Sequence, residues 1–465
     1  MEFNYKYKGS SKVNNTAGST GISFAPDTFR EPTFFKGLLN KKIPFREAIS
    51  ALHHIVVSDF RYQPKDRTAY LEWLKTQEDI WMAEIMANHQ EVKAQLDAKR
   101  FELNQLNNEA NKIMKPYYDA QRRYFKHLYV RDKAAWMVLD PVISVHPDSL
   151  FFECFSKDES SYGKLSCNYN VFKKVNEFEC GTTNIDYSYP LYNEFQKIRT
   201  YKETDFEIDP SGFEVQTGEY DAFKEVKIDL PDSWVRGFLQ VSSAMTMKAY
   251  QFDIDPVDMR NILFFLSRNK EKHGPRSIRW ILEPGKPVSI SVDPWNEKMI
   301  CGKSIYKGST SAEVRMWGRR RLKLLERMLP VSRKIKVTLL GTGMPSFFEA
   351  DLVDMTFTLG LSGWTNNDWS RSSNFDLMIP RYNTDGNIQQ KVFLELKKVW
   401  FISAEDMANR LGLTTTVVES VMTNFIQEGK VIYDLKDKVY RLRELTKDPL
   451  PMDKLRYRNE REQLA

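Results

Sequence analysis

Basic side chains are concentrated in residues 315–327, and they are the residues of this sequence best suited to gripping phosphates. Guanidinium and ammonium groups form charge-assisted hydrogen bonds with phosphate oxygens. Leucine and methionine side chains lie between them at helical spacing, which predicts an amphipathic cationic helix. Such a helix is a candidate nucleic-acid contact, although a basic helix is more often a solvated face paired with acids such as Glu326. The cations are Arg315, Arg319, Arg320, Arg321, Lys323 and Arg327.

Residues 399–446 carry a second pattern with a functional meaning. Ser403 is typical of a helix N-cap and Gly412 of a helix end, and a second helix is predicted over about 414–428. Two strands that meet at a turn near Lys436 follow, so the element order is that of a winged helix. In DNA-binding proteins of this kind the second helix enters the major groove.

The charge of that second helix argues against DNA. It has no Lys or Arg and carries Glu419 and Glu428, which phosphates would repel. The sequence therefore favours protein packing or protein binding for this module over DNA recognition. In the hairpin, Lys436 and Lys438 remain candidate nucleic-acid contacts.

Residues that bind metals or catalyse reactions form no recognisable set. The four cysteines include no CxxC pair and the six histidines include no HxxxH or HExxH spacing, so buried free thiols are predicted. Gly341-Thr342-Gly343 follows a predicted strand but lacks the third glycine of a dinucleotide-binding loop, and a simple turn is expected. No GxSxG elbow occurs. We therefore expect no catalytic residue, no metal ligand and no cofactor in this chain, and we expect that it is not an enzyme.

The order of predicted strands and helices along the chain predicts an α+β fold with mixed or antiparallel sheets and packed helices. β-branched and aromatic runs broken by polar turns predict strands from about residue 138 onward. The expected organisation is a flexible polar leader (1–27), the N-terminal part of the body (28–65), a helical-hairpin arm (66–137), the α+β body (138–361), a loop or linker (362–398), a winged-helix-like module (399–446) and a C-terminal tail (447–465).

The arm is predicted from a heptad pattern. From Val92 to Ile113, a seam that is apolar except for Lys99 recurs at alternating spacings of four and three, and a second helix over about 117–136 can fold back after Pro116. An arm within one chain is favoured over a coiled coil with a partner, because only about three heptads are regular.

Composition indicates a globular chain, with 42% hydrophobic and 28% charged residues. The net charge of +6 is a mild excess, far from that of a dedicated nucleic-acid binder. No apolar run is long enough to cross a bilayer, and the N-terminus lacks the apolar core of a signal peptide. We therefore expect a cytoplasmic protein with reduced cysteines and no membrane contact.

Four blocks of sequence resemble the bacterial SWIM zinc-finger family. They are residues 151–198, 230–241, 355–364 and 429–445, in the family's order, and the most specific element contains Gly181, Thr182, Thr183, Asn184 and Asp186. The long arm departs from the family, and the CxC and CxH zinc ligands expected beyond the last block are absent. The resemblance implies that zinc belongs only to that missing module. It also implies an association with MoxR-type AAA+ ATPases and von Willebrand A-domain proteins.

Two functions are compatible with these observations. The first is a non-enzymatic scaffold or adaptor that binds protein partners through the arm and the winged-helix-like module. The alternative is a nucleic-acid-binding protein that uses the basic helix 315–327 and the hairpin. The sequence leaves the partner and the oligomeric state open.

Overall fold

The computed structural model describes residues 12–15, 19–24, 33–60, 99–103, 105–106, 109, 141–184, 192, 195–201, 203–208, 232–270, 276–364, 367–370, 375–379 and 383–445. The chain divides into two compact units, of which one is Arg61–Met137 and the other is the rest. Each unit is described by itself, and everything below on packing concerns the larger one.

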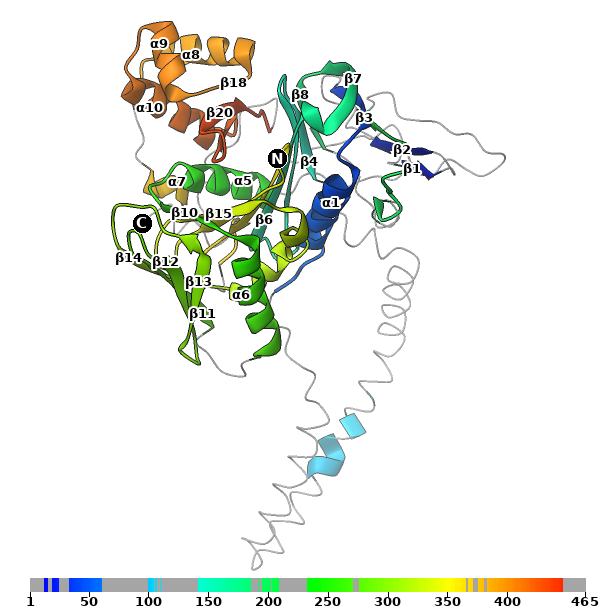
Figure 1. Cartoon of the computed structure of the whole chain (residues 1–465), viewed down its shortest axis with the longest axis vertical. Coiled ribbons are helices and arrows are strands. Elements are labelled where there is room, and N and C mark those ends of the chain that lie inside the picture. Colours follow the sequence, from blue (N-terminus) through cyan, green and yellow to red (C-terminus); the bar gives the residue numbers. More distant parts are fainter. Residues whose placement is uncertain are drawn as a thin grey trace, which may run out of the picture. The chain divides into compact units, whose positions relative to one another are not determined.

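An eight-stranded antiparallel sheet forms the centre of the body (Figure 1). Both of its faces are covered near β5 and β6. Leu52 and Ile55 of α1 (Lys42–Val56) lie against Gly163 on one face, and Phe238 of α5 (Asp232–Met245) packs on Phe155 on the other. Double coverage explains why β5 is an almost continuous apolar run whose residues are all buried. The strand order is β10 (Tyr250–Ile254), β15 (Lys334–Leu339), β16 (Ser346–Asp351), β17 (Met355–Leu361), β6 (Ser161–Asn168), β5 (Ser149–Phe155), β4 (Val142–Val145) and β8 (Gly181–Asn184).

Two further sheets flank this one. The antiparallel four-stranded sheet has the order β13 (Glu297–Ile305), β12 (Pro287–Val292), β11 (Ser277–Leu282) and β14 (Ala312–Trp317). The five-stranded sheet has the order β1 (Lys12–Asn15), β2 (Ser19–Phe24), β9 (Glu203–Ile208), β3 (Phe34–Leu39) and β7 (Phe172–Glu179), and its β2–β9 pair is parallel. The prediction of an α+β fold with mixed or antiparallel sheets is therefore confirmed.

Helix α6 (Pro256–Arg268) packs on β13 and on the 3-10 segments η2 (Arg319–Leu325) and η3 (Leu329–Val331). Its start was predictable, because Asp255 accepts a hydrogen bond from the amide of Val257 and Pro256 occupies the first turn. A third 3-10 turn, η1 (Tyr169–Val171), joins β6 to β7. No helix in the described parts of the chain reaches the length and hydrophobicity that crossing a bilayer requires.

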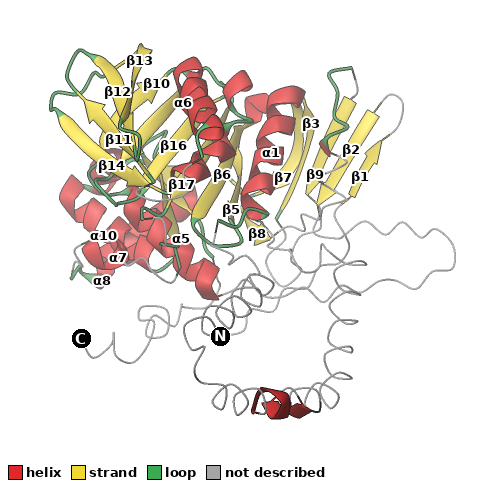
Figure 2. Ribbon diagram, turned by 90° about the horizontal axis from the view of Figure 1, so that it is seen from below, coloured by secondary structure: helices red, strands yellow, loops and turns green. Residues whose placement is uncertain are grey.

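The C-terminal module, residues 386–445, has a hydrophobic core of its own. It contains α8 (Gly386–Val399), α9 (Ala404–Leu411) and α10 (Thr415–Gln427), with a three-stranded sheet in the order β18 (Phe401–Ile402), β20 (Val439–Leu442) and β19 (Val431–Asp434). As predicted, Ser403 caps α9 and Gly412 ends α9 in the left-handed conformation, and Thr414 caps α10. The short helix α7 (Phe375–Met378) precedes the module, and Figure 2 shows α7, α8 and α10 gathered beside α5.

Two predictions about segments are wrong. The expected loop 362–398 contains α8, which Asp385 caps and whose Val392 and Leu396 are buried in the core of the module. Its apolar residues Ile388, Val392, Leu396 and Val399 recur every three or four positions, so the sequence carried a helical signal that the prediction did not use. The expected leader 1–27 contains β1 and β2, because β2 pairs with β9, a strand far away in the sequence.

Most of the predicted arm lies outside the described residues. Within 66–137 the structure describes 99–103, 105–106 and 109, which are helical, and Arg61–Met137 separates from the rest as a unit. The predicted tail, 447–465, also lies outside the described residues.

Candidate functional site

Helix α10, the predicted equivalent of a DNA-reading helix, packs against α5 of the body. Val418, Val421 and Phe425 fill the module's core, whereas the polar residues Ser420 and Thr423 are buried as well. The hydroxyls of Ser420 and Thr423 donate to carbonyls one turn earlier in α10, at 2.7 Å in both cases, so their burial leaves no polar atom unsatisfied. Helix α10 therefore faces the core of the C-terminal module on one side and is covered by the body on the opposite side.

A chain of side-chain amides fixes the end of α10 to the body. Gln427 Nε2 donates to the carbonyl oxygen of Asp376 at 3.1 Å. The carboxylate of Asp376 in turn accepts a hydrogen bond from Gln240 Nε2, at 2.6 Å, on α5. All three side chains are buried. The contact therefore has the specific, satisfied polar groups of a built interface.

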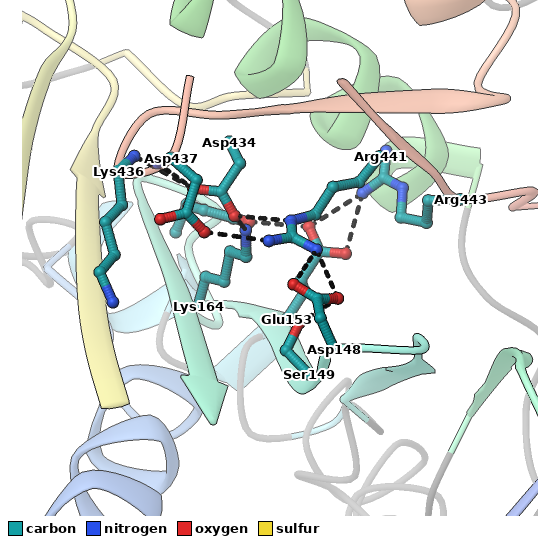
Figure 3. Close-up of polar contacts among 10 residues, drawn as sticks. Asp148, Ser149, Glu153, Lys164, Asp434, Lys436, Asp437, Arg441 and Arg443 are labelled. Atoms are coloured by element: carbon teal, nitrogen blue, oxygen red, sulfur yellow. Dashed lines mark hydrogen bonds and ion pairs between the residues drawn. The ribbon is translucent and has the colours of Figure 1, made fainter. Parts of the chain in front are cut away.

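The hairpin β19–β20 is fixed to the central sheet by buried ion pairs, which Figure 3 shows. Arg441 donates to both carboxylate oxygens of Asp148, at 2.9 and 3.0 Å, and to Asp434 and Asp437, at 3.0 Å each. Lys164 Nζ, on β6, donates at 3.0 Å to Oδ2 of Asp434, the same oxygen that accepts from Arg441. Arg441 is 2% exposed, so its guanidinium cannot reach a phosphate in this arrangement.

A second buried pair lies beside the first. Arg443 Nη1 contacts both oxygens of Glu153, at 2.9 and 3.1 Å, and both side chains are completely buried. Tyr162 donates its hydroxyl to the same carboxylate at 2.7 Å. The aromatic ring of Phe238 lies under the Arg443 guanidinium, 4.8 Å from it. The charge is therefore matched and hydrogen-bonded from several sides, as burial requires.

The pKa values of the nearby carboxyls follow from these contacts. Burial alone would raise the pKa of Asp434, but the charges of Lys164 and Arg441 hold that pKa well below its ordinary value. Glu349 lacks such close cations, since Lys336 Nζ is 3.8 Å from its Oε2, and burial raises the pKa of Glu349 to about 7.

The small space among these residues does not fit a substrate. Lys164, Glu349, Asp434 and Arg441 are among the side chains around it, and its volume is about 10 Å³. That is about the minimum needed for a single water molecule. The cluster is a packing interface between the C-terminal module and the sheet.

The prediction of one amphipathic cationic helix over residues 315–327 is wrong. Arg315 lies on β14 and only Arg319–Leu325 is helical, as a 3-10 segment, so the six cations do not share one solvated face. The chain reverses at Gly318, which adopts a φ of 67° and has no room for a Cβ beside the Arg321 guanidinium. The apolar spacing that predicted a helix instead inserts residues such as Leu322 and Leu325 into the core of the body.

Arg315 and Arg319 bind the loop that follows β12. Arg315 donates to Asp293 at 2.8 Å and to the Ser277 hydroxyl at 2.9 Å. Arg319, 2% exposed, donates to the carbonyl oxygens of Ser277 and Asp293. Burial would raise the pKa of Asp293, but the hydrogen bond from Ser277 and the charges of Arg279 and Arg315 keep that pKa below its ordinary value.

Arg321 and Arg327 are also bound within the body. Arg321 is 1% exposed and donates to the carbonyl oxygens of Ser160 and Trp364, at 2.9 and 3.1 Å, and burial lowers its pKa to about 10. Arg327 pairs with Glu47 at 2.9 Å. These contacts hold η2 in place.

Arg320 and Lys323 are the two members of the run that lie exposed. Both border a groove of about 390 Å³ next to the end of α6. Lys436 and Lys438, at the tip of the hairpin, are exposed as well, and the backbone amides of both bond to Asp434.

The family-motif residues form β8, an edge strand of the central sheet. Gly181 lies so close to the Thr33 side chain that a Cβ has no room there, and the Thr182 and Ser144 hydroxyls are 3.0 Å apart. Thr183 is buried and Asn184 pairs with Val142 in the register of the sheet. Asp186 lies outside the described residues. The described part of the motif is a structural element.

Within the described residues, no group of three or more His, Cys, Asp or Glu side chains is placed to hold a metal ion. The four cysteines are free thiols, and Cys154, Cys167 and Cys301 are buried, as predicted. Burial raises the pKa of Cys301 to about 12, which keeps its thiol protonated at neutral pH.

The sequence patterns did not identify Asp148, Glu153, Lys164 or Asp434 as members of a buried cluster. A signal for two of them exists: Glu153 and Lys164 are charged residues inside strands that are otherwise buried on both faces. Charged residues are almost never fully buried without a partner, so each implied an oppositely charged side chain nearby. The identity of the partners, almost 300 residues away for Glu153, depends on the tertiary fold.

Comparisons with known proteins add little. No family model matches the chain, and no curated protein matches it. Among solved structures, the proliferating cellular nuclear antigen of Entamoeba histolytica matches with 10% identity, 48% of this chain, 89% of that chain and a TM-score of 0.34. A PCNA2–PCNA3 complex from Sulfolobus tokodaii matches with 10% identity, 49% of this chain, 90% of that chain and a TM-score of 0.33. Likenesses of this strength carry no argument here.

Proposed function

We propose that this chain is a non-enzymatic adaptor or scaffold that binds protein partners. The observation that supports this most is the burial of α10 against α5. In our reading the C-terminal module is a winged helix whose groove-reading helix serves as an internal contact. Nucleic-acid recognition by that helix would require the module to leave the body and to expose Arg441, Arg443 and their carboxylate partners.

The resemblance to the SWIM zinc-finger family suggests what the adaptor works with. Members of that family tend to be encoded beside MoxR-type AAA+ ATPases and von Willebrand A-domain proteins, so we propose that an ATPase system of this kind includes the partner. The mild net charge of +6 agrees with a protein partner better than with a long polyanion.

The test is recovery of the complex from the chain's own cells. The tagged full chain, lightly cross-linked, is expected to retain a protein in stoichiometric amount after nuclease treatment. Retention of nuclease-sensitive material only, or of no protein in stoichiometric amount, would overturn the proposal. A variant in the exposed hairpin tip, Lys436→Glu with Lys438→Glu, should retain the same partner.

The second candidate is nucleic-acid binding by the exposed cations Arg320, Lys323, Lys436 and Lys438. Their exposure is what favours it, since exposed cations can approach phosphates. The burial of Arg319, Arg321, Arg441 and Arg443 weakens it, because the basic surface that remains is small.

A further inference from the structure

A groove of about 390 Å³ lies between the end of α6, η2 and Phe60. Its apolar lining residues are Phe60, which is 37% exposed, and Leu266, which is 8% exposed. Phe60 is held there by a hydrogen bond from its amide to Asp158, 2.9 Å long. The volume is within the range of pockets that hold a ligand or a large side chain.

The polar part of the groove is basic. Lys270, Arg320 and Lys323 line it with their exposed side chains, and Arg319 lines it from within the body. The other lining residues are Phe60, Leu266 and Asn269, so none of the described residues around the groove is acidic. An apolar hollow with cations at its rim is complementary to an apolar side chain flanked by carboxylates.

Contacts within the body hold two of the residues that line the groove, Arg319 and Asn269. The Arg319 guanidinium bonds to the carbonyls of Ser277 and Asp293 and lies 5.2 Å from the ring centre of Trp295. At the end of α6, the Asn269 side chain donates to the carbonyl of Phe265 at 3.0 Å. Both supports come from the body.

A peptide fits this surface better than a nucleic-acid strand does. A strand needs a row of cations that follows its phosphates together with flat aromatic platforms. Here Arg315, Arg321 and Arg327 donate to oxygens within the body and do not line the groove, and the exposed residues Lys270, Arg320 and Lys323 surround one hollow instead of forming a track.

We propose that this groove binds an acidic segment of a partner protein, with one aromatic or leucine side chain in the hollow and carboxylates paired with Lys270, Arg320 and Lys323. This inference rests on the proposed function, because it names the chemistry of the partner. The flanking carboxylates supply orientation and a fast encounter, and the buried anchor supplies most of the affinity.

The test uses fluorescence anisotropy of the full chain with three labelled probes. They are the peptide EDEFDED, the same peptide with Ser in place of Phe, and a single-stranded thymidine oligomer. Binding of EDEFDED should weaken by at least about tenfold in Arg320→Glu/Lys323→Glu, since two attractive pairs become repulsive. The peptide with Ser should bind about tenfold more weakly than EDEFDED.

A matched control keeps the change in net charge the same. Lys307→Glu/Lys391→Glu reverses two exposed cations that do not line the groove, and it should bind EDEFDED like the wild-type chain. A second variant, Phe60→Ser, should weaken EDEFDED while leaving the circular dichroism of the chain unchanged.

Each other outcome overturns the inference in a distinguishable way. If EDEFDED does not bind, or if both double variants weaken it equally, the groove is not a peptide site, and the adaptor proposal stands. If EDEFDED and the peptide with Ser bind equally, charge alone acts and the hollow has no role. If the thymidine oligomer binds and loses affinity in the groove variant, both the inference and the adaptor proposal fail.

Discussion

Both the segment around hairpin β19–β20 and the segments that line the groove beside α6 are rich in Lys and Arg. The fold buries the arginines of the first set and exposes cations of the second. In the hairpin, Arg441 and Arg443 are 2% and 1% exposed and bind carboxylates of the central sheet. At the groove, Arg320 and Lys323 are exposed around an apolar hollow. A basic residue in a sequence therefore indicates a binding partner only when its burial and its neighbours in the fold are known.

The largest effect is expected from breaking the buried pair of the hairpin. Arg443→Met leaves the Glu153 carboxylate buried without its cation, which should lower the free energy of unfolding by about 3–5 kcal/mol. Urea denaturation of the full chain measures this. The double variant Arg443→Met/Glu153→Leu should recover most of the loss, because the uncompensated charge is gone.

An exposed pair provides the control for that experiment. Lys334 and Asp253 lie 3.3 Å apart with 52% of each side chain exposed. Lys334→Met should therefore cost less than about 1 kcal/mol. A loss for Lys334→Met as large as that for Arg443→Met would contradict the distinction between buried and exposed cations.

The next effect concerns pH and Glu349. Its pKa is raised to about 7 in the folded chain against an ordinary value of 4.5, so between these pH values the folded state holds a proton that the unfolded state has lost. This contribution is present below about pH 4.5 and is lost as pH rises toward 7, by about 3 kcal/mol.

The measurement is the difference between the stability curves of the wild-type chain and Glu349→Gln over this pH range. Taking the difference removes the contribution of His146, whose pKa burial lowers and which acts with the opposite sign. Glu326→Gln, at an exposed position, should follow the wild-type curve. A pH-independent difference for Glu349→Gln would show that Glu349 is ionised in the folded chain.

A smaller effect is expected where α10 meets the body. Gln427→Ala removes the hydrogen bond to the Asp376 carbonyl and should cost about 1 kcal/mol. Gln389→Ala, which removes a hydrogen bond to Thr384 within a half-buried part of the chain, should cost less. If Gln427→Ala changed neither the free energy of unfolding nor the proteolysis of residues 386–445, the module would not be held as described.

The smallest effect is expected at the groove. Arg320→Glu/Lys323→Glu should change the free energy of unfolding by less than about 0.5 kcal/mol per substitution, since both side chains are exposed. A loss of several kcal/mol would show that Arg320 and Lys323 stabilise the fold as the buried arginines do, and the contrast with Arg443 would be lost.

The sequence predicted local structure well where caps and periodicity agree. Ser403 caps the helix that it was expected to cap, Asp255 and Thr414 are of residue types that favour the N-cap positions they occupy, and the buried strands of the central sheet appear as apolar runs. The prediction missed β2, whose partner β9 is distant in the sequence, and it overlooked α8, although Ile388, Val392 and Leu396 recur at helical spacing.

The candidate site was less predictable, for a physical reason. Whether Arg319 or Arg320 is buried depends on the turn at Gly318 and on carbonyls that β11 and the loop after β12 supply. Lys270 and Phe60 joined the groove only through the tertiary fold, because both are far from residue 320 in the sequence.

The central claim is that helix α10 and the buried arginines Arg319, Arg321, Arg441 and Arg443 make contacts within the fold. The chain is therefore proposed to bind protein and not nucleic acid. Fluorescence anisotropy of the full chain with mixed DNA and RNA probes, at low and moderate salt, tests it most directly. The account predicts no binding at moderate salt and no more than weak binding at low salt. Tight binding that weakens steeply with salt and falls in Arg320→Glu/Lys323→Glu would contradict it.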